Sequence, residues 1–189
     1  MDKKRRIIIF GLSGSGKSTL ADELGRALEL RVIHPSSILR DLLDGRVPDI
    51  THSQAGKGYW ESAEGIEAFQ DRLRKNTPLD FVCDQILLEE LKIGDVVIDS
   101  WSLPWLTDQG IKLCLKAHLA TRVNRVAKRS GVSPEAARRA IHMKDSETRK
   151  LYLKHKHFDI KKDHDVFSAN LRTDGLSIKE VLDWALRHI

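Results

Sequence analysis

The residues whose types and spacing could do chemistry form one short run, rich in glycine and serine. It reads Gly11-Leu12-Ser13-Gly14-Ser15-Gly16-Lys17-Ser18, which matches the phosphate-binding pattern G-x-x-x-x-G-K-[ST]. Glycines let the chain turn tightly around an anion, so that successive main-chain amides point at its oxygen atoms. A lysine ammonium group suits β- and γ-phosphates, and a serine hydroxyl suits Mg²⁺. This phosphate loop, residues 11–18, therefore predicts the binding of a nucleoside triphosphate, ATP with Mg²⁺.

The segments on either side of the phosphate loop are those that such a loop requires. Residues 5–10 are rich in β-branched side chains and predict a buried parallel strand. After the loop, Leu20, Leu24 and Leu28 recur at helical spacing, and the amino-terminal end of a helix favours anions. The residues expected to contact the triphosphate are Gly11, Ser13, Gly14, Ser15, Gly16, Lys17, Ser18 and Thr19.

One carboxylate stands where it could serve the same ligand. Asp99 follows the apolar run Val96-Val97-Ile98, which predicts a strand. In an open parallel sheet the carboxyl ends of the strands face the ligand crevice. Because Mg²⁺ in proteins usually takes a carboxylate, directly or through water, we expect Asp99 and Ser18 to form the metal site.

The rest of the chain alternates between short apolar runs and amphipathic segments. Strands are predicted at 30–34, 95–98, 111–117 and 165–171. Helices are predicted from a serine cap at 36 or 37 through 43, then at 60–75, 78–92, 119–130, 133–157 and 178–189, with loops at 46–59 and 101–110. Strands alternating with helices indicate a parallel sheet covered on both faces, in one domain.

Composition narrows the class of protein further. The net charge of +5 over 189 residues is modest, so no nucleic-acid partner is expected, and it suits a protein that binds small polyanions. No apolar run approaches the ~20 residues of a membrane helix, and the basic start is not followed by the apolar stretch of a signal peptide. We therefore expect a cytoplasmic monomer without membrane contact. The two cysteines, Cys83 and Cys114, have apolar neighbours and are expected to be buried free thiols.

Several segments together resemble one family. They are residues 11–19, the segment Ser36-x-x-x-Arg40-Asp41-Leu42, residues 94–99 and residues 146–170. In these the chain is similar to P-loop nucleoside monophosphate kinases, especially the short archaeal-type cytidylate kinases. The resemblance implies a P-loop NTPase-like three-layer αβα fold with a five-stranded parallel sheet in the order 2-3-1-4-5. It also implies a single domain, residues 1–189, with a helical acceptor-binding insert at about 35–93 and a helical lid at about 133–158.

The same resemblance implies roles for particular side chains. Ser36, Arg40 and Asp84 would lie at the acceptor, with Arg40 on its phosphate, since a guanidinium is a bidentate partner for phosphate. Lys17, Arg125, Arg149 and Asp99 would be catalytic, the two arginines by stabilising the charge of the transferring group. The basic residues of the helix before the lid and of the lid itself, from which one to three contacts are expected, are Arg125, Arg129, Arg138, Arg139, Lys144 and Arg149.

Two positions depart from the family pattern. Where the family carries an arginine after the acid that ends the third strand, this chain reads Asp99-Ser100-Trp101. Where it carries an arginine after an aspartate in the preceding helix, this chain reads Asp84-Gln85. Trp101 and Trp105 would then either offer flat surfaces to the acceptor or pack a loop against the core. We place Trp101 at the acceptor site.

The functional reading from the sequence is an ATP-dependent nucleoside monophosphate kinase, with CMP or dCMP as the first acceptor to test. Two alternatives remain open. One is a small-molecule kinase that phosphorylates a hydroxyl, with Asp99 or Asp41 as the base. The other is a nucleotide-binding switch or ATPase-like interaction protein, which the missing arginines and the long insert at 46–75 favour.

Overall fold

A single parallel sheet organises the molecule. The computed structural model describes residues 4–51, 58–72 and 78–189. In these residues the strands are β1 (Arg6–Gly11), β2 (Arg31–Ile33), β3 (Val96–Asp99), β4 (Ile111–Lys116) and β5 (Ala169–Arg172). They lie in the order β2-β3-β1-β4-β5, and every neighbouring pair is parallel. The sheet order and the αβα layers confirm the fold expected from the sequence.

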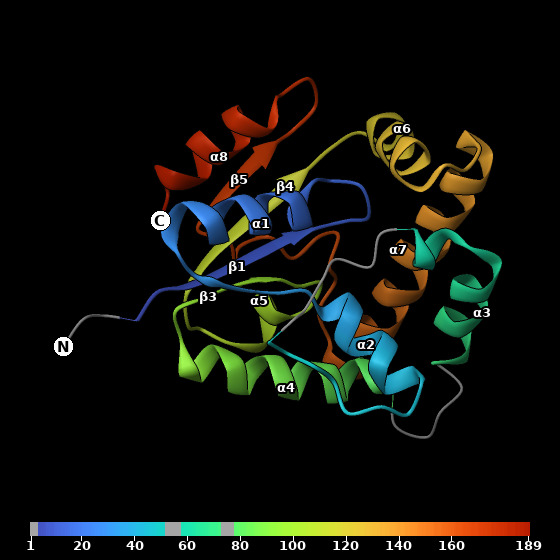
Figure 1. The fold of residues 1–189 in the computed structure, drawn as a ribbon, viewed down its shortest axis with the longest axis horizontal. Coiled ribbons are helices and arrows are strands. Elements are labelled where there is room, and N and C mark those ends of the chain that lie inside the picture. The colour runs from blue at the N-terminus through green and yellow to red at the C-terminus, as the bar shows by residue number, and fades with distance from the viewer. Residues whose placement is uncertain (1–3, 52–57, 73–77) are drawn as a thin grey trace.

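Helices cover both faces of this sheet because its strands are apolar on both sides. On one face, Ile7 and Ile9 pack with Leu24 of α1 (Lys17–Leu28) and with α8 (Ile178–Leu186). On the other face, Ile8 packs with Leu87 of α4 (Leu79–Ile93) and with α5 (Leu103–Leu106). Figure 1 shows the sheet between these two helical layers. The sheet is thus buried on both sides, which is the usual setting of parallel strands.

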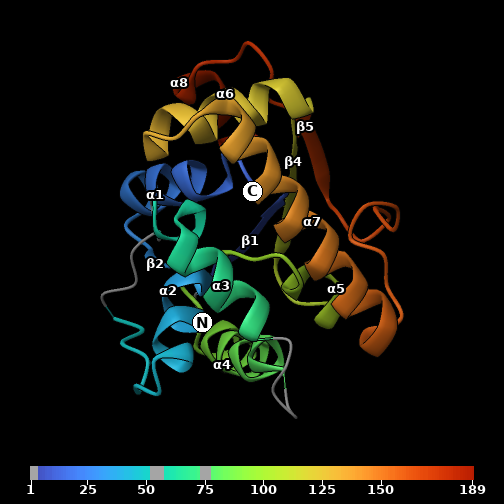
Figure 2. The ribbon, with the colours of Figure 1, turned by 90° about the vertical axis from the view of Figure 1, so that its right-hand side faces the viewer.

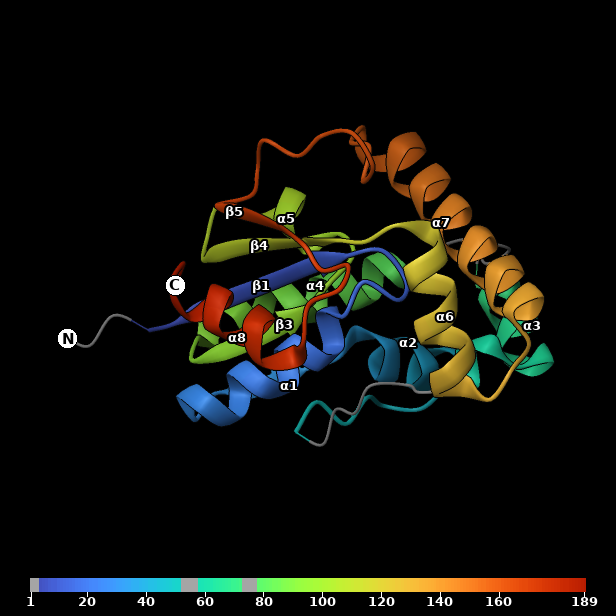
Figure 3. The same ribbon diagram turned by 90° about the horizontal axis from the view of Figure 1, so that it is seen from above.

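A second group of helices stands beyond the carboxyl ends of the strands. It consists of α2 (Pro35–Leu43), the 3-10 turn η1 (Tyr59–Glu61), α3 (Ala63–Asp71), α6 (Leu119–Ser130) and α7 (Pro134–Lys156). Figures 2 and 3 show α3, α6 and α7 together at this end, away from the layers that cover the sheet. The helices therefore enclose the edge at which the phosphate loop follows β1.

Most predicted elements are present, and α7 begins at the residues that were predicted to start it. The hydroxyl of Ser133 accepts from the amide of Ala136, so α7 begins as its serine and proline predicted. Both cysteines are buried free thiols, as expected. In the described part of the chain no helix has the length and apolar character that a membrane span requires.

Four details of the predicted elements are wrong. Pro35, not a serine, opens α2, so the cap position falls on His34 and Ser37 instead donates to the carbonyl of His34. The predicted 101–110 loop contains the short helix α5, because Ser102 and Pro104 form a helix start. β5 begins only at Ala169, four residues after the predicted start. The helix predicted at 60–75 is divided into η1 and α3, and its last residues, like 52–57 of the predicted loop, lie outside the described residues.

Candidate functional site

The phosphate loop curves tightly between β1 and α1, and at two of its glycines there is no room for a Cβ atom. A Cβ atom on Gly11 would lie 2.1 Å from the hydroxyl of Ser15 and 2.8 Å from the carbonyl oxygen of Leu115. Gly14 has φ +80°, and a Cβ there would lie 2.7 Å from the carbonyl oxygen of Arg122. Side chains at these positions would push the turn open. The loop is therefore packed from behind while its inner face remains available to an anion.

Two arginines of α6 hold the loop through its carbonyl groups. The guanidinium of Arg122 donates to the carbonyl of Ser13 at 3.1 Å and to Asp145 of α7 at 2.7 Å. Arg125 donates to the carbonyl of Ser15 at 3.3 Å and to the hydroxyl and carbonyl of Thr173 at 2.8 and 2.6 Å. A loop whose amides turn toward a ligand turns its carbonyls outward, where they need donors. Arg122 and Arg125 supply these donors.

Lys17 reaches from the start of α1 toward the inside of the site. Its ammonium nitrogen lies 5.5 Å from the centre of the Trp101 ring. Burial lowers the pKa of Lys17, while the negative charges of Asp99, Asp145 and Glu61 oppose that shift. An ammonium group held in such a dry position interacts strongly with an anion. Trp101 therefore borders the site, as predicted, on the side of the lysine.

Ser18 and Asp99 meet in a chain of polar side chains that ends at α1. The hydroxyl of Ser18 donates to Asp99, which is 5% exposed. Asp99 also hydrogen-bonds the ring of His34 at 3.0 Å, and the other ring nitrogen of His34 lies 3.0 Å from Asp22. Burial lowers the pKa of His34, but its hydrogen bonds and charge attraction to Asp99 and Asp22 outweigh burial and raise it. The histidine thus fixes the carboxylate that faces Ser18.

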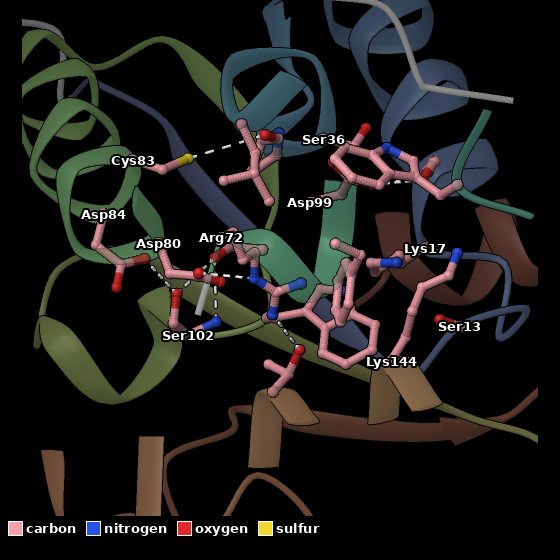
Figure 4. Close-up of a pocket in the computed structure, with 18 of the residues that line it drawn as sticks. Ser13, Lys17, Ser36, Arg72, Asp80, Cys83, Asp84, Asp99, Ser102 and Lys144 are labelled. Atoms are coloured by element: carbon pink, nitrogen blue, oxygen red, sulfur yellow. Dashed lines mark hydrogen bonds and ion pairs between the residues drawn. The ribbon is translucent and has the colours of Figure 1, made fainter. Parts of the chain in front are cut away.

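A cavity of about 160 Å³ extends from the phosphate loop into the space under α3 and α7. Figure 4 shows Ser13, Lys17 and Lys144 on one side of it, and Asp80, Asp84 and Ser102 on the other. The wall comes from the phosphate loop, α2, η1, the end of α3, α4, residues 99–102, α6 and α7. The site is therefore assembled from segments that are far apart in the sequence.

Basic side chains of α6 and α7 enter this cavity close to the loop. The ammonium group of Lys144 lies 2.5 Å from the carboxylate of Glu61 in η1, and Arg129 lies 3.1 Å from the same carboxylate. Burial lowers the pKa of Lys144, and the charge of Glu61 opposes this. Lys17 and Arg129 each lower the pKa of Lys144 by repulsion. Lys17, Arg129 and Lys144 thus converge on one region of the cavity, which the carboxylates of Glu61 and Asp99 also line, and such a cluster of cations suits phosphate oxygens.

The far end of the cavity is built around Asp84. Its two carboxylate oxygens accept from the hydroxyl of Ser102 at 2.5 Å and from the hydroxyl of Tyr152 at 2.7 Å. Burial raises the pKa of Asp84 to about 7, although these two hydrogen bonds act in the opposite direction. A carboxyl group that titrates near neutral pH can both donate and accept a proton in the site. Asp84 therefore lies at the end of the cavity away from the phosphate loop, and its role at the acceptor stays a prediction.

Other predicted site residues lie elsewhere. Ser36 lines the cavity, but Arg40 is exposed and its guanidinium carbon lies 4.2 Å from the centre of the Tyr59 ring. Arg149 forms a two-point ion pair with Asp159, outside the cavity. Thr19 is also exposed.

Trp105 and two arginines of the predicted lid, Arg138 and Arg139, also lie away from the cavity. Trp105 packs between aromatic rings, stacked on Phe158 with 5.0 Å between centroids, so it holds its loop to the core. Arg138 and Arg139 are exposed. Of the basic residues of α6 and α7 considered from the sequence, Arg129 and Lys144 are those that line the cavity.

Several residues of the site were missed by the sequence reading, among them His34, Trp60, Glu61 and Arg72. His34 stands at the carboxyl end of a short predicted strand, as Asp99 does. His34 could therefore have been placed at the site on the same grounds as Asp99. Glu61 and Arg72 lie in the insert, in a polar stretch without a motif, and no sequence signal pointed to them. Arg72 is 0% exposed and lines the cavity beside Asp80.

Known proteins are similar in sequence to this chain over most of its length. Residues 6–171 match the model of the cytidylate kinase-like family. The cytidylate kinase of Pyrobaculum calidifontis is 33% identical over 185 residues, which are 97% of this chain and 91% of that protein. The cytidylate kinase of Pyrobaculum islandicum is 30% identical, with the same coverage of both chains.

Solved structures show the same fold at low sequence identity. The shikimate kinase of Bacteroides thetaiotaomicron has a TM-score of 0.59 at 16% identity and covers 98% of both chains. That of Acinetobacter baumannii has a TM-score of 0.56 at 15% identity, covering 98% of this chain and 93% of its own. With the family match and with a phosphate loop at the mouth of a parallel sheet, the chain belongs to the cytidylate kinase-like family of phosphotransferases.

Proposed function

We propose that this protein is an ATP-dependent nucleoside monophosphate kinase that transfers the γ-phosphoryl group of ATP to CMP or dCMP. One observation carries the proposal: the phosphate loop and a second group of buried polar residues open into the same cavity. The curated relatives named above are cytidylate kinases, which directs the choice of acceptor to a cytosine nucleotide. In this proposal residues of about 35–93 bind the acceptor and residues of about 133–158 form the lid.

The phosphate loop would hold the triphosphate through its amides, with Lys17 on the β- and γ-phosphates. Ser18 and Asp99 together offer two hard oxygen ligands next to Lys17, and His34 holds Asp99 in place. Mg²⁺ takes one or two such protein ligands and completes its shell with substrate phosphates and water, so these residues fit that ion. When bound, Mg²⁺ would supply positive charge to the β- and γ-phosphates.

The transfer itself needs positioning and charge more than covalent chemistry. An oxygen of the acceptor's phosphate attacks the γ-phosphorus in line, and the bond to the bridging oxygen of ADP breaks. The acceptor phosphate is already ionised, so no strong base is needed. Lys17, Arg129 and Lys144 face the region where charge builds up, and burial makes each interaction stronger than in water. Closure of α6 and α7 over the cavity would exclude water that would otherwise hydrolyse ATP.

The alternatives considered from the sequence are less well supported. Phosphorylation of a hydroxyl and a nucleotide-dependent switch are not favoured, because the relatives are named for kinase activity on cytidylate. The proposal retains small nucleotides as the partners. The protein would act as a monomer in the cytoplasm, where both ATP and nucleoside monophosphates are present.

The test is a direct assay of acceptor dependence. The protein is incubated with ATP and Mg²⁺, with and without each of CMP, dCMP, UMP, AMP and GMP, and both ADP and the diphosphate product are measured. We expect ADP formation that depends on CMP or dCMP, with an equal amount of CDP or dCDP formed. Equal ADP formation with and without every acceptor would contradict the proposal and favour an ATPase-like protein.

A further inference from the structure

Two buried hydrogen-bond donors without acceptors line the same cavity. Arg72 is 0% exposed, and its Nη1 atom has no hydrogen-bond partner among the described residues. Trp60 is 6% exposed, and within the same residues its indole Nε1 atom also has no partner. A buried donor that has lost water and gained nothing is costly, so native proteins rarely keep one without a purpose. Two such donors facing one cavity indicate a ligand that accepts hydrogen bonds.

The rest of the Arg72 side chain is held rigidly, which leaves Nη1 as the guanidinium nitrogen without a hydrogen-bond partner among the described residues. Its Nε atom donates to Asp80 at 2.8 Å, and Nη2 donates to the hydroxyl of Thr148 in α7 at 3.1 Å. The ring of Phe69 lies against the guanidinium, with 3.2 Å between its centre and Cζ. Figure 4 shows Arg72 in the middle of the site, between Asp80 on one side and Lys17 and Lys144 on the other. Its free edge is thus preorganised for a ligand.

The charges around these donors favour a compact anion. Lys17, Lys144 and Arg129 line the same cavity. Four carboxylates of the described residues line it too. Glu61 is paired with Lys144 and Asp80 with Arg72. Asp99 accepts from Ser18, and Asp84 accepts from Ser102 and Tyr152. A guanidinium edge and an indole N–H match a phosphate group, which offers several acceptor oxygens. The position between the phosphate loop and Asp84 is where a phosphate that attacks the γ-phosphorus of ATP would lie.

We propose that Arg72 and Trp60 bind the phosphate group of the acceptor nucleotide, taking the place of the arginines that this chain lacks at Gln85 and Trp101. This assignment rests on the proposed function, because it names the acceptor's ligands in that reaction. It replaces Arg40 as the main phosphate ligand, since Arg40 is exposed and packs on Tyr59 outside the cavity. The insert thus supplies the ligands of the acceptor phosphate through η1 and the end of α3. The positions in α4 and after β3 where the family carries arginines supply none in this chain.

Binding measurements with paired ligands test the assignment. The affinities of CMP, cytidine and ATP are measured by calorimetry for the wild type, Arg72→Lys, Trp60→Phe and Trp184→Phe. Trp60→Phe removes the unpaired N–H together with the five-membered ring and keeps one buried aromatic ring, and Trp184→Phe makes the same change elsewhere, so this pair also serves if Arg72→Lys fails to fold. Trp184→Phe, on α8 at the opposite face of the sheet, is the matched control.

We expect Arg72→Lys to weaken CMP binding by about 10- to 100-fold, and Trp60→Phe by about 3- to 10-fold, as lost hydrogen bonds to a charged group imply. Cytidine and ATP affinities should stay within about 2-fold in each variant, and Trp184→Phe should match the wild type. Unchanged CMP affinity in Trp60→Phe and Arg72→Lys, or an equal loss for cytidine or ATP, would overturn the assignment while leaving the proposed function intact. A wild type that binds no nucleoside monophosphate would overturn both.

Discussion

The two ends of the cavity are built in different ways. At the nucleotide end, the ligands come from one contiguous loop, and glycines such as Gly11 and Gly14 are set by close packing. At the acceptor end, Trp60, Arg72, Asp84 and Tyr152 come from four elements and meet only in the folded chain. The ligands of the first end lie in one short segment, which Arg122 and Arg125 of α6 support from behind, whereas those of the second end meet only where helices pack. Ligand roles are therefore easier to assign at the nucleotide end than at the acceptor end.

The largest expected effect comes from the nucleotide end. Lys17→Ala should lower kcat by about 100- to 1,000-fold, the usual result of removing a preorganised group that stabilises transferring charge. It should not lower stability, because burial of the ammonium group is already unfavourable, as its lowered pKa shows. Steady-state kinetics and thermal unfolding of the same sample check both statements. A variant that melts well below the wild type, or that turns over at a similar rate, would contradict this role.

A smaller effect tests whether the arginine behind the loop acts through structure. Arg125→Ala removes the hydrogen bonds to Ser15 and Thr173 and should lower the free energy of unfolding by about 2 to 3 kcal/mol. ATP affinity should fall with it, because the loop loses its support. Urea denaturation measures the stability, and Arg172→Ala, an exposed arginine of the adjoining strand, should change it by less than about 1 kcal/mol.

A direct catalytic role for Arg125 would give the opposite pattern. In that case kcat would fall strongly in Arg125→Ala, while the free energy of unfolding and the ATP affinity would stay near the wild-type values. The same measurements on both proteins therefore separate the two roles. Such a result would place Arg125, like Arg129 of the same helix, among the residues that act on the transferring group rather than among those that support the loop.

The smallest of the three effects is at the acceptor end and depends on pH. Because the pKa of Asp84 is raised in the folded protein to about 7, folding favours its neutral form. The stability that Asp84 contributes is therefore complete below its unfolded pKa and is lost as pH rises toward 7 and beyond. Between pH 5.5 and 7.5 this loss amounts to about 2 kcal/mol.

Asp84→Asn should abolish that loss, since its amide does not titrate, while its oxygen can accept from one of the hydroxyls of Ser102 and Tyr152 and its NH2 group can donate to the other. The free energy of unfolding of Asp84→Asn, relative to the wild type, should thus rise by about 2 kcal/mol from pH 5.5 to 7.5. Urea denaturation of both proteins at the two pH values measures the difference. Parallel stability curves would show that Asp84 is already ionised at pH 5.5, and would contradict the buried, neutral carboxyl group described here.

Much of the fold was predictable because its signals are local. The α6 boundaries agree with the prediction, and the start of α7 follows from Ser133 and Pro134. The errors arose where a neighbour competes with the local signal: Pro35 moves the start of α2 away from the serines, and Ser102 with Pro104 turns a predicted loop into a helix. Elements whose first turn is encoded by a single strong residue are thus the reliable ones.

In the candidate site, too, local signals in the sequence identified some residues, whereas the positions of others depend on packing. Asp99 was found because it ends an apolar strand, and its contact with Ser18 follows from the parallel sheet. Arg125 and Arg129 share one face of α6, four residues apart, yet Arg125 turns to the back of the phosphate loop while Arg129 reaches Glu61 in the cavity. No pattern of residue types distinguishes them, because the difference depends on where α6 sits against the loop.

By itself, the sequence predicted a triphosphate-binding loop between β1 and α1, because the glycines, the lysine and the helix start lie within eight residues, although Arg122 and Arg125 of α6 support that loop in the folded chain. The tertiary structure alone decided which side chains face the acceptor. Arg72 meets Thr148, 76 residues later, and Trp60 shares their cavity. Such meetings depend on the packing of helices against one another, which no short segment encodes.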